Sequence, residues 1–422
     1  MTTANLPNSA VEPRPLAGTR AIPCTIMRGG TSRGVFFHAE DLPQNRPVVD
    51  AMLLNVFGSP DVRQISGLGG ASSQTSKAAI ISRSVRDDAD VDYTFAQVSV
   101  DQPVIDWGGN CGNMSSAVGP FAINEGLVSV LGDVGSVRIF NTNTGKIIVA
   151  QVPLVDGQAA PAGDFGIPGV PGTAARIRLE FLDPGGSQSG NLLPTSRPRD
   201  SVTLADGRRL TVSVVDAGNP VVFLSAAEIG LRGTELPTEI EANEEATRAL
   251  EEARGIVASW LGIVSDPGDA TRLSPGLPKV GFVAPPATYQ SSIGERIPAE
   301  SMDLVGRLMS MQTAHRSYMV TGAICTAAAA VVEGTLVHEV TRKTATDTPT
   351  ERTVRIGHPY GVLETDVRAS GGPREPRILS VTVDRTARYI MRGFVYVPER
   401  VFAESPPTSA TRPSSAGSAW SG

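Results

Sequence analysis

The chain has 422 residues, of which 41% are hydrophobic and 19% are charged, and its formal net charge is −6. This length can bury a sizeable core and favours two structural units over one. Its charges are mixed in sign and slightly acidic overall, so no broad basic face is present and we expect no nucleic-acid or membrane partner. An anionic ligand would have to be held by a few local donors.

The two ends of the chain have a composition typical of disorder. Residues 1–18 are rich in Pro, Asn and Thr and lack the apolar core of a secretory signal, and residues 404–422 are low in complexity. The longest small-apolar stretch, 322–332, is too short to span a membrane. The three cysteines, Cys24, Cys111 and Cys325, are too few for a disulfide framework. We therefore expect a cytoplasmic protein with a disordered leader and tail.

Two polar, glycine-rich loops come first along the chain. The loop 28–34 precedes an apolar run and can bind an anion through backbone N–H groups and hydroxyls. The loop 69–76 leads into Lys77, which opens the apolar run 78–81, and partial burial there would lower the lysine pKa toward use as a base. A solvated surface lysine is the alternative. Neither loop has the spacing of a P-loop or dinucleotide turn, so we expect no nucleotide cofactor.

The next feature is a glycine-bearing turn, 107–113, followed by small apolar residues that can form a closely packed helix. Cys111 lies at the predicted helix start, where the helix dipole and free N–H groups lower a thiol pKa and can seat a carboxylate. Packing of a small residue is the alternative for this cysteine, but its neighbours Asn110, Gly112 and Asn113 are unusual for a core position.

Strands dominate the middle of the chain. Residues 137–152 resemble a hairpin around the turn 141–145, and 176–181 and 210–214 alternate between apolar and polar residues as half-buried strands do. Residues 243–261 carry apolar side chains at helical spacing and predict a packing helix.

Residues 320–330 repeat the layout of the first glycine-bearing turn and helix, which suggests a chain built from two related halves, each with a helix N-terminus that can seat an anion. His315 and Arg316 precede this second turn and would lie near its seat. The four histidines and three cysteines form no group with ligand spacing, so the sequence predicts no metal site.

Four segments resemble the aconitate and methylaconitate isomerases: 27–37, 108–113, 216–220 and 278–283. This family includes oxalomesaconate tautomerases and methylitaconate isomerases, is similar in fold to diaminopimelate epimerase, and is matched from about Ile22 to Pro398. The resemblance implies an α+β fold of two pseudo-symmetric domains, each a curled, mostly antiparallel sheet around a central helix, with the active site in the cleft between them. We place the first domain at 19–203 plus 394–403 and the second at 204–393.

The resemblance also implies the site residues. The epimerases use two facing cysteines, of which Cys111 matches the first, whereas the second position falls near Val320 or Thr321 and Cys325 becomes structural. The missing second thiol argues against stereochemical inversion. Family isomerases are understood to use a lysine, matched by Lys77, with the first cysteine, so Lys77 and Cys111 are the predicted catalytic pair. The predicted binding residues are Arg28, Gly30, Thr31, Ser32, Ser73, Gln74, Asn110, Gly112, Asn113, Asn219, Lys279, His315, Arg316, Thr321 and Gly322.

The implied function is a cofactor-independent isomerase that shifts the double bond of an unsaturated tricarboxylate by allylic proton transfer. Conversion of cis-aconitate to trans-aconitate is the leading reaction, and 2-methylaconitate, 4-oxalomesaconate and methylitaconate are alternative substrates. An inactive polycarboxylate-binding or accessory protein is an alternative of another class. The resemblance suggests a homodimer.

Overall fold

The computed structural model describes residues 16–343, 348, 350–372 and 375–403. The predicted tail and most of the predicted leader lie outside these residues. Where the chain is described, no helix is long and apolar enough to cross a membrane.

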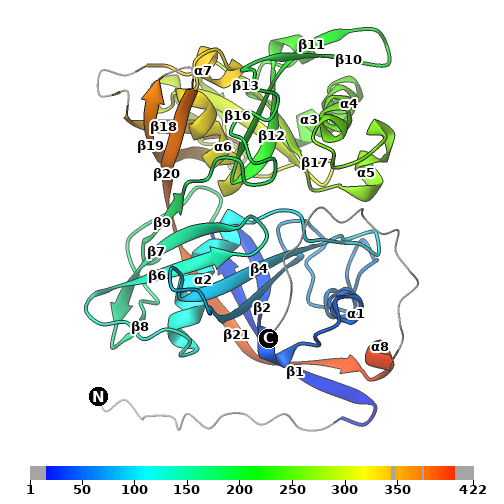
Figure 1. The fold of residues 1–422 in the computed structure, drawn as a ribbon, viewed down its shortest axis with the longest axis vertical. Helices are drawn as coiled ribbons and strands as arrows, with labels where there is room; N and C mark the ends of the chain where they lie inside the picture. The colour runs from blue at the N-terminus through cyan, green and yellow to red at the C-terminus, as the bar shows by residue number, and fades with distance from the viewer. Residues whose placement is uncertain (1–15, 344–347, 349, 373–374, 404–422) are drawn as a thin grey trace.

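The structure consists of two halves stacked along its long axis (Figure 1). The first half contains α1 (Arg46–Phe57), α2 (Gly112–Asn124), α8 (Arg400–Ala403) and the strands β1 (Thr19–Gly29), β2 (Ser32–His38), β3 (Lys77–Arg83), β4 (Val91–Val98), β5 (Ile105–Asp106), β6 (Val134–Asn141), β7 (Lys146–Val155), β8 (Gln158–Ala159), β9 (Ile177–Leu182) and β21 (Ala387–Pro398).

The second half contains the remaining described elements. Its helices are α3 (Pro237–Ala242), α4 (Glu244–Trp260), α5 (Ala270–Leu273), α6 (Val320–Val331) and α7 (Leu336–Val340). Its strands are β10 (Asp200–Thr203), β11 (Arg209–Ala217), β12 (Asn219–Ser225), β13 (Lys279–Ala284), β14 (Tyr289–Gln290), β15 (Arg296–Ile297), β16 (Leu304–Ser310), β17 (Thr313–Ala314), β18 (Glu351–His358), β19 (Gly361–Gly372) and β20 (Glu375–Arg385).

The two halves repeat one pairing scheme. In the first half, the hairpin β1–β2 continues through parallel β2–β3, antiparallel β3–β4, parallel β4–β6 and the antiparallel pairs β6–β7 and β7–β9. In the second half, the hairpin β11–β12 continues through parallel β12–β13, antiparallel β13–β16, parallel β16–β18 and the antiparallel pairs β18–β19 and β19–β20. This repeat makes β3 the counterpart of β13 and α2 the counterpart of α6, and it confirms the predicted pseudo-symmetric α+β fold.

The sheets of the two halves are joined where β9 pairs with β20. After β20 the chain returns to the first half as β21, which pairs antiparallel with β1 from Thr19 to Gly29. β10 pairs with β11, so the predicted boundary at 203/204 separates partner strands, and the boundary at 393/394 cuts through β21. The residue limits of the two domains therefore stay a prediction, and strand pairing alone would move β10 to the second half and all of β21 to the first.

Each half encloses a central helix of small residues. Both α2 and α6 are buried along almost their whole length and contact strands of their own half. Small side chains are required here, since a Cβ atom on Gly119 of α2 would lie 2.9 Å from a Val152 methyl group of β7. A helix that is apolar on all sides must be buried, and the short side chains allow the strands to approach it closely.

Local predictions agree with this fold in most places. The predicted hairpin around 141–145 is β6–β7, and the predicted strands at 176–181 and 210–214 are β9 and β11. The predicted helix at 243–261 is α4, which the Asn243 side chain caps. The second predicted helix starts earlier than expected. α6 begins at Val320, which places Gly322 within its first turn instead of in the turn before it.

Candidate active site

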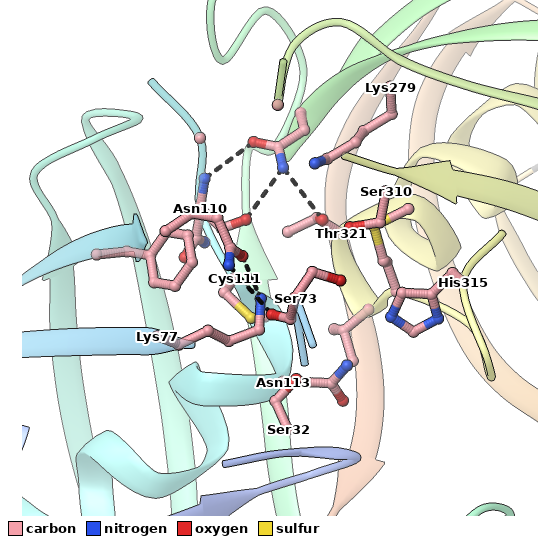
Figure 2. Close-up of a pocket in the computed structure, with 18 of the residues that line it drawn as sticks. Ser32, Ser73, Lys77, Asn110, Cys111, Asn113, Lys279, Ser310, His315 and Thr321 are labelled. Carbon is pink, nitrogen blue, oxygen red and sulfur yellow. Dashed lines mark hydrogen bonds between the residues drawn. The ribbon is translucent and has the colours of Figure 1, made fainter. Parts of the chain in front are cut away.

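A cavity lies between the halves at the point where α2 and α6 begin (Figure 2), and it encloses about 40 Å³ of free volume. Both halves contribute to its wall. The predicted site residues that line it are Ser32, Ser73, Lys77, Asn110, Cys111, Gly112, Asn113, Asn219, Lys279, His315 and Thr321. Eleven of the seventeen residues predicted from the sequence are therefore brought to one place.

Lys77 and Cys111 lie side by side in this cavity. Lys77 is the first residue of β3, is 7% exposed, and donates from Nζ to Gln97 Oε1 at 2.5 Å. The Gln97 amide nitrogen donates to the carbonyls of Ser73 and Ser76, which holds its oxygen toward the lysine. Burial lowers the Lys77 pKa, and the charge and hydrogen bond of the Cys111 thiolate oppose this shift. The site thus makes the Lys77 amine easier to deprotonate than a solvated lysine and places it beside the Cys111 sulfur.

The start of α2 provides one group of hydrogen-bond donors. Cys111 is the N-cap, and its side chain caps no backbone N–H. The first recorded backbone bond runs from Ser115 N to Cys111 O at 3.0 Å, which leaves the N–H groups of Gly112 and Asn113 without a protein acceptor in the described chain. The Asn113 Oδ1 accepts from Thr31 N at 3.3 Å, so its amide N–H₂ is turned toward the cavity. These donors form a seat for a carboxylate.

The start of α6 provides a second group. Met319 is its N-cap and forms no side-chain capping bond. The first backbone hydrogen bond of the helix runs from Ala323 N to Met319 O at 2.8 Å. The N–H groups of Val320 and Thr321 consequently have no protein acceptor where the chain is described. This terminus faces the same cavity as the start of α2.

Lys279 and His315 form a third group. Burial lowers the pKa of Lys279 to about 8, and the nearby Asp106 carboxylate opposes that shift. Burial lowers the pKa of His315 to about 3, so the imidazole is neutral near pH 7. Its Nδ1 accepts from Ser317 N at 3.2 Å, which assigns the ring proton to Nε2 as a donor.

Asn219 lines the cavity but offers no free donor to a ligand. Its Nδ2 donates to Asn110 O at 3.0 Å and to Thr321 Oγ1 at 3.2 Å, and its Oδ1 accepts from Asn110 N at 3.1 Å. An amide nitrogen has two protons, so both are used. The predicted role as a carboxylate donor therefore conflicts with these hydrogen bonds.

Six predicted binding residues lie away from the cavity wall. The Arg28 guanidinium donates to Gly30 O and to Thr386 and so braces the β1–β2 turn. Arg316 is 48% exposed and pairs with Glu241 at 3.2 Å. The other four are Gly30 and Thr31 at the turn, Gln74 beside a neighbouring cavity, and Gly322, which packs against Leu308.

Sequence reasoning missed several wall residues: Phe95, Gln97, Asp106, Gly109, Gly276, Ser310, Met319 and Val320. Gln97 pairs across the sheet with Lys77, and the Phe95 ring lies 5.3 Å from the Lys77 ammonium. Asp106 accepts from Gly108 N at 2.7 Å and closely approaches Gly276. The sequence shows that Gln97 is a polar residue in an apolar strand, but not which residue it contacts. Its position beside Lys77 follows only from the pairing register of β3 and β4.

The arrangement suits proton transfer on an anion. An amine and a thiol lie in contact, and three groups of donors surround them. Within the described residues, no group of three or more His, Cys, Asp or Glu side chains could hold a metal ion.

Comparison with known proteins agrees with this chemistry. A model of the family described as "PrpF protein" matches residues 19–398. The 3-methylitaconate isomerase of Eubacterium barkeri is 45% identical and covers 89% of this chain and 97% of its own length. The 2-methyl-aconitate isomerase of Shewanella oneidensis is 39% identical, covering 90% and 97%, and the 4-oxalomesaconate tautomerase of Pseudomonas putida is 40% identical, covering 90% and 97%.

Solved structures give the same result for the fold. A crystal structure of a methylitaconate-delta-isomerase is 42% identical, covers 94% of this chain and 100% of that chain, and superposes with a TM-score of 0.73. A hydroxyproline epimerase from Agrobacterium vitis is 10% identical, covers 90% and 93%, and has a TM-score of 0.51, which indicates a shared fold alone. The chain belongs to the PrpF family and is an isomerase built on the proline racemase/diaminopimelate epimerase-like fold.

Proposed function

We propose that this isomerase shifts the carbon–carbon double bond of an unsaturated tricarboxylate by allylic proton transfer, with cis-aconitate to trans-aconitate as the leading reaction. The observation that carries the proposal is the contact of buried Lys77 with the partly exposed Cys111 between two facing helix N-termini. A protein that only binds polycarboxylates would need the donors but not the acid–base pair, and the named relatives are isomerases.

Three donor groups favour three carboxylates over two. One group is the start of α2 with Asn113, the second is the start of α6 with Thr321, and the third is Lys279 with His315. In Figure 2 they surround the catalytic pair, with Asn113 below it, Lys279 above it and His315 to the right. Hydrogen bonds between charged and uncharged partners contribute about 1.5–3 kcal/mol each, so each seat would add measurable affinity.

The mechanism uses both members of the pair. The uncharged Lys77 amine removes a proton from the methylene that is α to one carboxylate and allylic to the alkene. The electron pair spreads over a dienolate, whose charge the helix N-termini and Lys279 stabilise. The Cys111 thiol then protonates the far carbon and the double bond is displaced by one position. A proton passes from the Lys77 ammonium to the adjacent Cys111 thiolate and restores the starting state.

Aconitate has a nearly symmetric skeleton, so displacement of its double bond returns aconitate, and a change between cis and trans geometry is the visible product. The names of the relatives support second candidates with the same chemistry, namely 2-methylaconitate, methylitaconate and 4-oxalomesaconate.

Proton NMR of cis-aconitate in deuterated buffer tests the proposal. We expect trans-aconitate to appear with solvent deuterium at the carbon that is protonated. If aconitate is unchanged and one of the three other acids isomerises, the substrate assignment is wrong but the reaction class stands. Isomerisation of any substrate without exchange of solvent deuterium, at low conversion and high conversion alike, would contradict this two-residue mechanism.

A further inference from the structure

The Asn219 side chain forms hydrogen bonds with the backbone of the opposite half of the molecule. It is the first residue of β12 in the second half, is fully buried, and binds both the N–H and the C=O of Asn110 in the first half. Its second amide proton goes to Thr321 in the first turn of α6. Two hydrogen bonds of one side chain thus connect the second half to the residue directly before Cys111, and the third fixes that side chain to α6 of its own half.

The segment that carries Cys111 is held on both sides of Asn110 by its own half. Asn143 Nδ2 donates to Trp107 O at 2.8 Å, and Cys111 O accepts from Ser115 N at 3.0 Å and from Ser115 Oγ at 3.1 Å. Residues 107–111 belong to no helix or strand. Across the described chain, the recorded hydrogen bonds of the Asn110 backbone are those to Asn219. Gly108 N is held by Asp106, two residues further from the thiol. The backbone direction at Asn110 contributes to where the next side chain points, and Asn219 is the partner that holds the Asn110 backbone.

The pseudo-symmetric contact in the other direction is weaker. There, Thr31 of the β1–β2 turn meets Ser317, which lies two residues before the α6 N-cap, through one hydroxyl pair at 3.0 Å. The equivalent N-cap is Met319, which has no acid–base group. The stronger contact therefore belongs to the helix start that carries the reactive thiol.

The size of the cavity bears on how substrate reaches the Asn219 contact. The cavity encloses about 40 Å³, whereas a cavity of roughly 150 Å³ is what a benzene-sized molecule occupies, and a tricarboxylate is larger. If the halves separate to admit substrate, the two hydrogen bonds between Asn219 and Asn110 break, and they re-form when the halves come together again.

We propose that Asn219 is a positioning residue that aligns Cys111 when the halves close, and not a substrate-binding residue. The proposal rests on the role assigned to Cys111 under the proposed function. It links the approach of the second half, which brings donors for substrate, to the orientation of the thiol in the first half.

The experiment compares Asn219→Ala with a matched control, Ser317→Ala, which removes the counterpart contact at the other helix start. The first measurement is the rate at which iodoacetamide alkylates Cys111 in the absence of substrate, followed by peptide mass spectrometry. Cys24 and Cys325 are buried, so Cys111 is the accessible thiol among the three. The second measurement is kcat and KM for the substrate that the wild type turns over.

We expect Asn219→Ala to change the alkylation rate several-fold and to lower kcat by roughly 10- to 100-fold with KM nearly unchanged, because a misplacement of about 1 Å can reduce the rate by that much. Ser317→Ala should match the wild type in both measurements. If Asn219→Ala does not fold, Asn219→Asp replaces it, because this isosteric change also loses both donated hydrogen bonds.

Two results would overturn the proposal. One is a higher KM with kcat and alkylation unchanged, which would make Asn219 a substrate-binding residue. The other is an equal change of alkylation in the Ser317 control, which would show a general loosening of the contact between the halves. A changed alkylation rate in a protein whose wild type turns over none of the candidate acids would support the positioning role and reject the proposed function.

Discussion

The two halves of the molecule present the same elements to the cavity with different side chains. β3 and β13 are counterparts, and each begins with a lysine, Lys77 or Lys279. α2 and α6 are counterparts, and each begins at the cavity without a side-chain cap. The N-caps differ, because the first is Cys111 and the second is Met319.

This difference divides the work between the halves. Lys77 lies against a thiol, and the largest influence on it is burial, so its pKa is lowered. Lys279 is buried too, but Asp106 opposes the loss of its charge, and its pKa of about 8 leaves it mostly protonated at pH 7. We therefore propose that the repeated scaffold places acid–base chemistry in one half and charge for binding the substrate in the other. Inversion would need a second acid–base group at the α6 start, where Met319 lies.

Loss of either member of the pair should have the largest effect. We expect Lys77→Ala or Cys111→Ala to lower kcat by about 10²- to 10⁴-fold, since general acid–base groups contribute in that range. Binding of trans-aconitate, measured by calorimetry, should persist because the donor groups remain.

The counterpart variant Met319→Ala serves as the reference for this prediction, because it alters the equivalent N-cap without removing an acid or base. A loss of kcat in Met319→Ala as large as that in Cys111→Ala would break the division between the halves.

Lys279→Gln should have the next largest effect, on binding. Loss of one charge-assisted contact of about 1.5–3 kcal/mol predicts a KM roughly 10- to 100-fold higher. The change in kcat should be smaller, because the two helix N-termini still stabilise the dienolate charge. The ammonium is present below pH 8 and is lost above it, so the wild-type KM should rise as pH increases through about 8.

Steady-state kinetics from pH 6 to 9.5 tests this assignment, and Lys279→Gln should lack the alkaline rise. A rise that persists unchanged in the variant would assign it to another group. Because the pKa of His315 is lowered to about 3, we expect no inflection from this imidazole in that range.

Much of this site could be predicted from the sequence because its signals are local. Glycine-bearing turns before small apolar residues predicted the starts of α2 and α6, and a lysine between a polar loop and an apolar run predicted Lys77. The resemblance to a known family added the pairing of Lys77 with Cys111, which the structure places in contact.

The remainder depends on contacts that the sequence does not show. Arg28 belongs to a matching motif, yet its guanidinium points to backbone oxygens of its own turn and of Thr386, over 350 residues away along the chain. Asn219 lines the cavity as predicted, but one of its amide protons is used by Asn110 of the other half and the second by Thr321 of its own half. Motifs identify which residues gather at a site, whereas hydrogen-bond partners decide what each one does.

The two halves also differ at the glycine in their first hairpin turn. Gly30 in the β1–β2 turn and Gly218 in the β11–β12 turn both have positive φ, +51° and +74°. A Cβ on Gly30 would collide with the Asn113 amide, whereas a Cβ on Gly218 would meet Ile324 at an ordinary 3.5 Å. Both alanine variants should lose about 1 kcal/mol or more of unfolding free energy through backbone strain.

Only Gly30→Ala should also raise KM, by several-fold, because it displaces a donor of the α2 seat. Denaturant unfolding and steady-state kinetics on both variants test this. Equal effects on KM would mean that strain in the turn, and not the position of Asn113, controls binding.

The smallest effect is expected from the cysteine of the second half. Cys325 lies inside α6, is fully buried, and donates from Sγ to Val215 O at 3.2 Å. Burial raises its pKa well above the ordinary thiol value, so it is held as a neutral thiol and has no acid–base function near pH 7. Cys325→Ala should keep kcat and KM within about twofold and lose about 1 kcal/mol of unfolding free energy, as typical point substitutions do.

Measurement of unfolding free energy and of turnover for Cys325→Ala beside Cys111→Ala separates the two roles, because Cys111→Ala should retain its stability and lose turnover. A Cys325→Ala protein that unfolds like the wild type but is inactive would show that the second half also contributes a reacting thiol.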